Sequence, residues 1–485
     1  MTLKLLENQR GIGEQPLNHM TLSTAHAELT NWTKSACSPC FLYRANNMVE
    51  ITRALEVART QHLTVIPHGA GHSYTDAALN TRGVVIDVTP MRRILSWDAA
   101  NGVMRVEPGV TLKDIVQAAW KDGWWPYISP STSEATIGGC TSMNINGKNS
   151  WKYGPFGAHI LSLDVLLASG DVCTIEPGRD PQLFHAFVGS MGLLGILTSI
   201  TLQMQRVSSG FVKVRNYTAG SLDEIFALFA GLEGSSDYLE AWLDGFARGN
   251  QFGRGYLTSG ALSDTKKEAP DPFPVSGRLN QLETSLASLA GVLGRQVLLP
   301  GVEMANHAIY GWSRLSRART SQFALSPFTY WPTAAFAGYH TMFPEGAETF
   351  QAFVPERCAK VTFKRVLSYS QEEGFMPVWC VIKQHREDTF LLSYQVDGFS
   401  LELNYQRTPQ TAQRLKQVLQ DMISMVIEAG GRFYLAKDHF LTHAQYRQSM
   451  GDEAVDAFLQ LKQRYDPEML LQSDLFRRVF RPPLR

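Results

Sequence analysis

The sequence has few cysteines, no excess of either charge and no long apolar run. Only 6 cysteines occur in 485 residues, so we expect no disulfide framework in a chain of this size. Lys plus Arg and Asp plus Glu both total 45, and without a basic excess we expect no nucleic-acid partner. No apolar run approaches the roughly 20 residues that span a bilayer, and no N-terminal stretch has the order of a secretory signal. We therefore expect no transmembrane segment and a cytoplasmic protein.

The few cysteines also lack the spacing of a metal site. Cys37-Ser-Pro-Cys40 is a lone Cys-x-x-Cys with no second pair, which disfavours zinc. Two buried or incidental thiols are the simplest interpretation, and a redox role for the pair stays open. We predict no metal ion.

The most informative stretch runs from Val65 to Asp76. An apolar segment at 63–66 predicts a strand, which Pro67 ends, and the glycines Gly69 and Gly71 follow. Glycine takes backbone angles closed to other residues, so successive N–H groups can point into one concavity that suits a phosphate. The alternative is a tight turn between strands. It is disfavoured because two more glycine-rich runs follow, at intervals that one large cofactor can span.

The second run extends from Ser129 to Ser150 and contains Thr-Ile-Gly-Gly at 136–139. The third reads Gly189-Ser-Met-Gly-Leu-Leu-Gly195. Its spacing is not the Gly-x-Gly-x-x-Gly of a Rossmann turn, so a nicotinamide site is disfavoured.

Taken in order, these motifs resemble the FAD-binding domain of the vanillyl-alcohol oxidase superfamily, the PCMH-type flavin domain. The resemblance covers residues 41–207 and includes Val-Glu-Pro-Gly-Val at 106–110. Within that superfamily the sequence is most similar to sugar oxidases of the decaprenylphosphoryl-ribose oxidase type and to aldonolactone and alditol oxidases. Asn146-Gly-Lys-Asn149, Phe156-Gly-x-His159 and Leu435-Ala-Lys-Asp438 carry that likeness, together with the ending at 466–478.

The resemblance implies FAD as cofactor. Hydroxyls and backbone N–H groups of the second run, including Ser133, would wrap the pyrophosphate and the flavin edge, and Ile196 would approach adenine or ribose through its backbone. Asn144, Asn146 and Lys148 would reach the isoalloxazine or the substrate; for the two asparagines a turn-forming role is the alternative. The implied cofactor-binding residues are His68, Gly69, Ala70, Gly71, His72, Ser73, Ser131, Thr132, Thr136, Gly138, Gly139, Cys140, Asn144, Asn146, Gly147, Gly192, Gly195 and Ile196.

His72 is the most specific of these residues. In superfamily members whose first loop reads Gly-x-Gly-His-Ser, such as the aldonolactone oxidases, that histidine commonly bonds to the flavin 8α-methyl. The decaprenylphosphoryl-ribose oxidases lack it. The resemblance therefore implies covalent FAD through His72, and a histidine that only hydrogen-bonds a phosphate or backbone group is the alternative.

Lys437 is the first candidate for substrate chemistry. It follows the apolar segment 433–435, which predicts a strand, and it matches the family's active-site lysine. A cationic amine near oxidised flavin can orient a substrate hydroxyl and stabilise developing negative charge. With a lowered pKa it can also take the hydroxyl proton. A surface charge is the alternative.

Glu402 and Lys383 are further catalytic candidates. The strand predicted at 399–405 alternates, so Glu402 belongs to a polar face that either lines the substrate pocket or meets water. The matching strand of the similar oxidases faces the flavin, and their mycobacterial members have cysteine where Glu402 stands. This departure puts a ribose-lipid substrate in doubt. Lys383 ends the neighbouring predicted strand and can join the pocket.

The expected fold is α+β: a two-domain PCMH-type FAD-binding fold with an α+β substrate domain. We expect a lead-in at 1–33 without chemistry, the FAD-binding domain at 34–207, the substrate domain at 208–429 and a C-terminal segment, 430–485, that returns to the FAD domain. Residues 233–345 are expected to be irregular, except that the pattern of 279–297 is compatible with a helix. Strands are predicted at 378–383, 389–395 and 399–405, and helices at 47–61, 112–120, 361–371 and 408–429.

The resulting expectation is an FAD-dependent enzyme that oxidises an alcohol of a sugar, polyol or related small molecule by hydride transfer to flavin N5. Oxygen or another acceptor would then re-oxidise the flavin. One alternative is a flavin-dependent reductase or dehydrogenase with a non-oxygen acceptor. Another is a flavin-carrying interaction protein.

Overall fold

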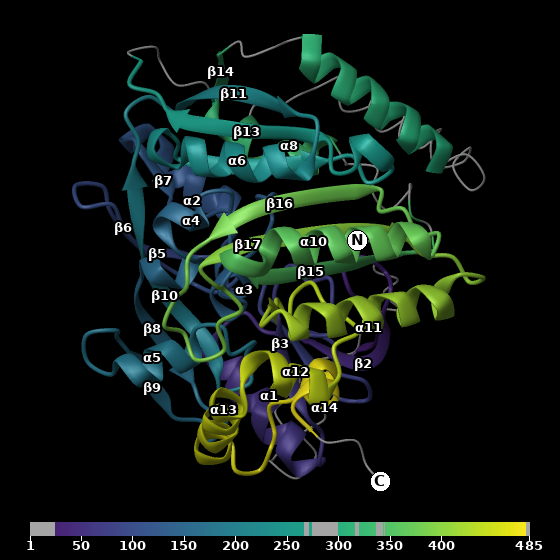
Figure 1. Cartoon of the computed structure of the whole chain (residues 1–485). Helices are drawn as coiled ribbons and strands as arrows, with labels where there is room; N and C mark the ends of the chain where they lie inside the picture. Colours follow the sequence, from purple (N-terminus) through teal and green to yellow (C-terminus); the bar gives the residue numbers. More distant parts are fainter. Residues whose placement is uncertain are drawn as a thin grey trace.

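The computed structural model describes residues 25–265, 271–273, 299–315, 320–335, 343 and 345–481. Within these ranges the strands form three sheets, and helices accompany all of them (Figure 1). The protein is therefore of the mixed α+β class, as the sequence predicts. The segment 279–297, expected as a helix, lies outside the described residues.

The first sheet comes from the N-terminal part of the chain. Its elements are β1 (Ala25–Thr30), β2 (Cys37–Arg44), α1 (Met48–Thr60), β3 (Val65–His68) and β4 (Val84–Asp87). The strand order is β1-β2-β4-β3, with β4 parallel to both β2 and β3. Pro67 does not end β3, contrary to the prediction. It is tolerated because β3 is an edge strand, where a missing N–H breaks no ladder bond.

The second sheet is antiparallel, and its strands come from residues 94–206. It has the order β5-β6-β10-β8-β9, with β7 paired to β10. The predicted helix after Thr111 is confirmed, since Thr111 and Asp114 form a capping box. The elements are β5 (Ile94–Asp98), β6 (Val103–Val106), α2 (Leu112–Ala119), η2 (Trp120–Asp122), β7 (Trp124–Pro126), α3 (Ile137–Ser142), α4 (Ser150–Tyr153), η3 (Phe156–His159), β8 (Ile160–Leu166), β9 (Val172–Ile175), α5 (Pro181–Phe187) and β10 (Ile196–Arg206).

The third sheet has eight strands in the order β14-β11-β13-β12-β16-β17-β15-β18. Residues 299–315 are also helical. The elements of this part are β11 (Phe211–Ala219), α6 (Leu222–Leu232), η4 (Glu233–Ser235), β12 (Tyr238–Leu243), η5 (Gly249–Gln251), β13 (Gly255–Leu262), β14 (Ser321–Ala324), α8 (Leu325–Ala335), β15 (Ala347–Pro355), α10 (Glu356–Glu372), β16 (Trp379–His385), β17 (Gly398–Gln406), α11 (Ala412–Glu428) and β18 (Arg432–Phe433).

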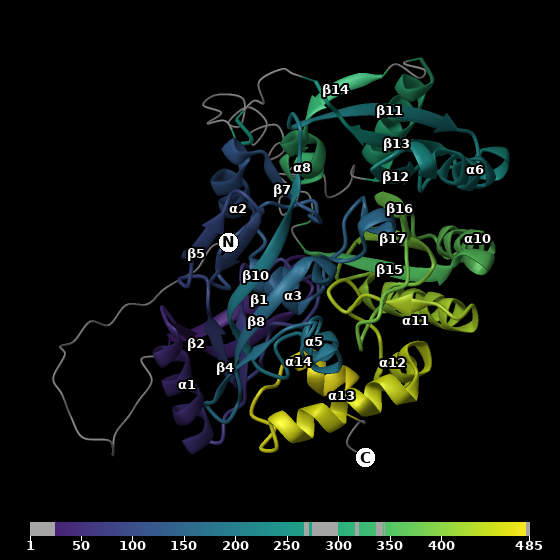
Figure 2. The same cartoon turned by 90° about the vertical axis from the view of Figure 1, so that its left-hand side faces the viewer.

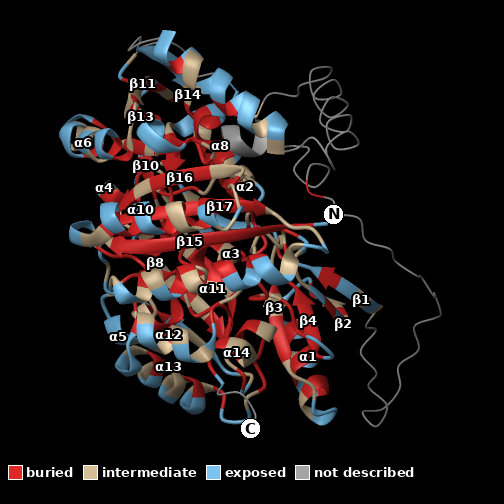
Figure 3. Ribbon diagram, turned by 45° about the vertical axis from the view of Figure 1, so that its right-hand side comes forward, coloured by how far each residue is buried: buried red, intermediate tan, exposed pale blue. Residues whose placement is uncertain are grey.

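This sheet has one apolar and one polar face. Leu401 and Leu403 of β17 share a face with Phe350 and Ala352 of β15, and all four belong to the main hydrophobic core. Helices α6, α10 and α11 cover that face, while the first two sheets lie on the opposite side (Figure 2). Burying each large apolar side chain contributes roughly 1.5–3 kcal/mol. The alternation of β17 therefore directs Glu402 toward the other sheets, although the strand is buried along most of its length (Figure 3).

The C-terminal helices return to the first sheet. They are α12 (His443–Met450), α13 (Asp452–Tyr465) and α14 (Asp474–Val479). Leu471 forms a parallel bridge with Val65 of β3, and Leu470 and Leu471 pack in one cluster with α1. The C-terminal segment therefore lies beside α1 and β3 of the first sheet (Figure 1).

Two expectations about the chain were wrong. Residues 233–345 are not irregular throughout, because β12 and β13 pair with each other and β12 pairs with β16. The strand predicted at 389–395 is a loop. Its aromatic side chains Phe390 and Tyr394 are buried against other loops instead of alternating across a sheet. The lead-in, for which no chemistry is expected, contributes β1, which pairs with β2.

Among the described residues, no helix combines the length and the apolar character that crossing a membrane requires.

Candidate functional site

The first glycine loop connects β3 to Ala77 and packs on the second loop. Gly71 has φ +69°, a left-handed conformation that favours glycine. A Cβ at Gly69 would collide with Thr136 Oγ1. Ser73 Oγ is buried and makes no hydrogen bond within the described part of the chain. A buried hydroxyl of this kind costs free energy unless a ligand pairs with it, so the loop fits a phosphate-bearing cofactor.

His68 and His72 lie at the two ends of the Gly69–Gly71 turn. His68 is buried, and desolvation lowers its pKa despite the nearby Asp87. The His72 ring is partly exposed and lies 4.5 Å from the ring of Trp32, which follows β1. His72 is therefore accessible and held against an aromatic side chain from the N-terminal segment.

The second loop begins the short helix α3. Thr136 caps it by accepting a hydrogen bond from Gly139 N at 3.3 Å, and Gly138 packs closely on Pro108. Thr132 Oγ1 accepts from Glu134 N. Cys140 is buried in the core, where desolvation raises its pKa. Any contact of Cys140 with a cofactor would therefore come from its backbone.

The asparagines after α3 have structural partners. Asn144 has φ +45°, and its side chain accepts from Gly157 N at 2.8 Å. Asn146 Nδ2 donates to Tyr394 Oη at 3.2 Å, and Tyr394 Oη donates to the Asn144 carbonyl at 2.6 Å. The turn-forming alternative therefore describes the Asn144 side chain. Gly147 N bonds to Ser150 Oγ at 2.8 Å.

The third loop meets the other two. Met191 N donates to Ser142 O at 2.9 Å. Gly192, with φ +76°, lies so close to Pro67 that a Cβ there would approach Pro67 Cγ to 2.6 Å. Gly195 leads into β10, whose first residue, Ile196, pairs opposite Leu166. All three glycine loops, distant in sequence, therefore converge.

A cavity lies where the second and third loops face the loop after β16. Tyr394 and Tyr434 form an aromatic wall there, with ring centroids 4.2 Å apart. The lining residues are Met143, Asn144, Val188, Gly189, Met191, Phe390, Leu392, Tyr394, Phe433, Tyr434 and Leu435.

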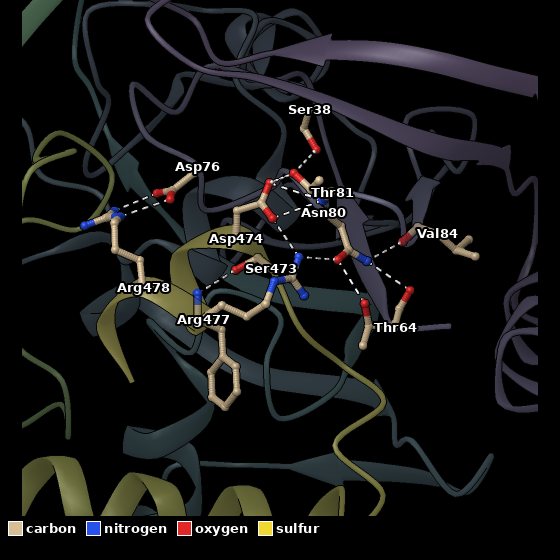
Figure 4. Close-up of polar contacts among 11 residues, drawn as sticks. Ser38, Thr64, Asp76, Asn80, Thr81, Val84, Ser473, Asp474, Arg477 and Arg478 are labelled. Atoms are coloured by element: carbon tan, nitrogen blue, oxygen red, sulfur yellow. Dashed lines mark hydrogen bonds and ion pairs between the residues drawn. The ribbon is translucent and has the colours of Figure 1, made fainter. Parts of the chain in front are cut away.

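The C-terminal segment contacts the end of the first glycine loop and the turn that follows it (Figure 4). Arg478 makes a two-point ion pair with Asp76, at 2.6 and 3.0 Å, just after the first loop. Asp474 accepts from Thr81 N at 3.0 Å. Lys462, fully buried, donates to the third-loop carbonyl of Leu193 at 2.7 Å. The glycine loops and the C-terminal helices therefore form one hydrogen-bonded unit.

The Lys437 turn lies directly against the first glycine loop. Tyr74 N donates to Ala436 O at 2.8 Å, and Thr75 Oγ1 donates to Leu435 O at 2.7 Å. Lys437 Nζ lies 3.7 Å from the centre of the Tyr74 ring. The predicted strand before it is short, and Lys437 is in the turn that follows β18. A partly buried ammonium is thus held beside the expected flavin site.

Glu402 is the ion-pair partner of this lysine. Lys437 Nζ donates to Glu402 Oε1 at 2.9 Å, and the two side chains are 20% and 12% exposed. Burial acts to raise the Glu402 pKa, but the charges of Lys437 and Lys383 outweigh it and hold that pKa below its ordinary value. Glu402 is therefore ionised at neutral pH, and its polar strand face does not simply meet water.

Lys383 lies farther along the same polar face. It is opposite Ser400 in the β16–β17 register. Its Nζ lies 3.6 Å from Glu240 Oε2, and Lys148 Nζ lies 3.3 Å from Glu240 Oε1. The structure thus brings together all three residues predicted to act on substrate, and it adds Lys148 from the end of the second loop.

Three residues of this region are not identified by the sequence analysis as site residues: Trp32, Tyr74 and Glu240. A usable signal existed for Glu240, which is the only charged residue in the apolar strand 238–243. Trp32 and Tyr74 have no such signal, because only the folded chain places their rings beside His72 and Lys437.

Comparison with known proteins agrees with this geometry. Residues 39–176 match a family model described as an FAD binding domain. Decaprenylphosphoryl-beta-D-ribose oxidase of Mycolicibacterium smegmatis is 27% identical over 94% of this chain and 98% of that protein. L-gulono-1,4-lactone dehydrogenase of Mycobacterium tuberculosis is 24% identical over 93% of this chain and 99% of that protein. D-lactate dehydrogenase of Archaeoglobus fulgidus is 31% identical over 33% of this chain and 38% of that protein.

The matching family model, the similarity to these relatives and the three converging glycine loops lead to one assignment. The chain has a PCMH-type FAD-binding domain and is an FAD-dependent oxidoreductase.

Proposed function

We propose that this protein oxidises an alcohol group of a sugar, polyol or related hydroxylated molecule. The Lys437–Glu402 ion pair beside the first glycine loop carries the proposal. It is supported by the names of the relatives that match over more than nine tenths of the chain, which refer to a ribose derivative and a sugar lactone.

The division of the chain into domains belongs to this proposal. The FAD domain would comprise residues 34–207 and 430–485, and residues 208–429 would form the substrate domain. The sheet topology supports the boundary near residue 207, because the first two sheets end at Arg206 and the third begins at Phe211. At the second boundary, β18 still pairs with β15 of the third sheet before the chain returns to the first sheet. The substrate would then lie between the glycine loops and the polar face of the third sheet.

Alcohol oxidation removes a hydride from carbon and a proton from oxygen. Bound FAD supplies the hydride acceptor at flavin N5. Glu402 is an ionised carboxylate, so it can accept the hydroxyl proton. Lys437 Nζ can donate to the same hydroxyl oxygen, orient it and stabilise its developing negative charge. Lys383 would hold another polar group of the substrate.

The cofactor would be held by the glycine loops. Ser73 Oγ offers the clearest contact, because it is buried without a protein partner in the described chain. Backbone N–H groups of Gly69 to Gly71, and groups of the second run from Ser131 to Gly139, would surround the pyrophosphate. Asn146 and Gly147 would approach the flavin ring, and Gly192, Gly195 and Ile196 the adenosine part.

Attachment of the flavin through His72 is a separate part of the proposal. The ring of His72 is partly exposed on the first loop, and the contact with Trp32 restricts its orientation. A bond from an imidazole nitrogen to the 8α-methyl group would remove one hydrogen from each partner. The two electrons released would reduce the flavin itself, and the electron acceptor of the reaction would then re-oxidise it. The alternative remains a non-covalent hydrogen bond.

Anaerobic reduction of the yellow holoprotein tests the proposed function. Polyols, sugars and hydroxy acids would be mixed separately with it, and bleaching of the flavin absorbance would be followed. We expect polyols or sugars to bleach the flavin. A panel in which no alcohol bleaches it would contradict the proposal and favour a flavin-carrying interaction protein.

Oxygen uptake during turnover then separates an oxidase from a dehydrogenase with another acceptor. Turnover with an artificial acceptor but without oxygen uptake would identify the dehydrogenase.

A further inference from the structure

Glu240 bridges two lysines that come from different parts of the chain. It projects from β12, next to the register pair of Ala241 with Ile382 in β16, and its Oε2 lies 3.6 Å from Lys383 Nζ. Lys148 approaches its other carboxylate oxygen and also donates to Phe328 O at 3.3 Å. The bridge is anchored, since Leu239 N donates to Lys148 O at 2.9 Å.

This bridge continues to the proposed catalytic pair. Lys383 lies opposite Ser400, and Glu402 is two residues farther along the same face of β17. Charges therefore alternate along the sheet in the order Lys148, Glu240, Lys383, Glu402, Lys437. These five side chains are 12–20% exposed, so each keeps partial access to solvent.

We propose that Glu240 is a specificity-determining residue of the substrate pocket, which makes the site accept uncharged polyhydroxylated substrates and exclude those bearing phosphate or carboxylate. This inference rests on the proposed function. It goes beyond that function because it specifies the charge of the substrate and the residue that selects it.

The physical reason is the balance of charges among Lys148, Glu240 and Lys383. Two neighbouring ammonium groups alone would bind a phosphate or carboxylate strongly. Glu240 bridges both of them, and an anion placed there would also be repelled by the carboxylate. Hydroxyl groups fit beside these alternating charges, because each hydroxyl can donate to a carboxylate and accept from an ammonium. The Glu240 carboxylate would thus give specificity by repelling anionic ligands.

Binding of inorganic phosphate to the holoprotein provides a test that needs no turnover. Glu240→Gln keeps the shape and removes the charge. We expect phosphate to bind E240Q at least about tenfold more tightly than wild type, measured by calorimetry. In E240Q/K383Q the affinity should return toward the wild-type value. Glu428→Gln is the matched control, because Glu428 is exposed and pairs with Arg365 on the surface.

Equal phosphate affinity in wild type and E240Q would overturn the inference, and Glu240 would then only orient the lysines. Flavin content and melting temperature establish that each variant is folded. If E240Q does not fold, Glu240→Ala serves in its place with the same expected gain.

Substrate selectivity gives the second readout. Sorbitol and sorbitol 6-phosphate differ only by the phosphate. The second-order rate constant for flavin reduction would be measured with each of them. We expect wild type to prefer the neutral polyol at least about tenfold and E240Q to lose most of that preference. An unchanged ratio in E240Q would contradict the inference. If no alcohol reduces the flavin in any variant, the proposed function fails, while the phosphate titration still decides the role of Glu240.

Discussion

Lys437 Nζ donates a hydrogen bond to Glu402 Oε1 at 2.9 Å, and the same ammonium lies 3.7 Å from the centre of the Tyr74 ring. The lysine turn, the polar face of the third sheet and the first glycine loop therefore meet at one point.

Lys437→Ala should leave FAD binding intact but slow flavin reduction severely. Loss of a group that acts mainly in the transition state costs about 3 kcal/mol, or roughly a hundredfold in rate. Anaerobic stopped-flow absorbance measures the rate. Lys416→Ala, at an exposed position on α11, is the matched control and should react like wild type. Reduction of K437A at the wild-type rate would return Lys437 to the surface-charge interpretation.

Glu402→Gln should also slow flavin reduction about a hundredfold, since the amide cannot take the substrate proton. In wild type the rate should stay constant from neutral pH down to about 5 and fall only below the ordinary carboxyl pKa of 4.5, because Lys437 and Lys383 hold the Glu402 pKa down. In K437A the residual rate should fall at a higher pH, since removal of a cation disfavours the carboxylate. An acid limb at the same pH in both proteins would exclude Glu402 as the titrating base.

Arg478→Ala should destabilise the protein and weaken retention of FAD. It leaves the buried Asp76 carboxylate without its two-point partner, a loss that typically costs about 3–5 kcal/mol. Arg478→Lys should recover only part of this loss, because an ammonium cannot make the paired contact. Melting temperature and flavin release in mild urea measure both effects. Full stability in R478A would show that the C-terminal helix does not support the loop.

The same ion pair predicts how stability depends on pH. Burial would raise the Asp76 pKa, but Arg478 lowers it below the ordinary 3.8. A carboxyl with a depressed folded-state pKa stabilises the fold above its unfolded pKa. This contribution should therefore be present at neutral pH and be lost as the pH falls below about 4. R478A should show less of this acid destabilisation than wild type.

Acid precipitation tests the proposed His72 linkage. If the imidazole is bonded to FAD, the yellow colour should stay in the protein pellet, and the intact mass should exceed that of the chain by FAD less two hydrogens. His72→Ala should release the flavin on denaturation yet still bind it when native, because the loops make most of the contacts. Flavin found wholly in the acid supernatant of wild type would show a non-covalent cofactor and leave the FAD assignment unchanged.

The order of the glycine loops, the helix caps and the strand alternation were determined by the sequence, because they depend on neighbouring residues. Thr111 begins α2 as predicted, since a capping box needs only residues three apart. The alternation of 399–405 likewise places Glu402 on a polar face. The motif at 435–438 contains the turn that the structure places against the first glycine loop, but it does not indicate that Glu402 is the partner of Lys437.

Only the tertiary structure decided which residues meet. The Glu402–Lys437 pair and the bridge from Lys148 through Glu240 to Lys383 depend on the register of strands far apart in the chain. Local patterns do not contain that register. The segment around Tyr394 is a second example, because its pattern predicts a strand. In the structure the Tyr394 side chain is held by Asn144 and Asn146 of the second glycine loop, and 389–395 is a loop. A contact between distant segments is set by the packing of whole sheets, whereas a cap or a turn is set by the few residues that form it.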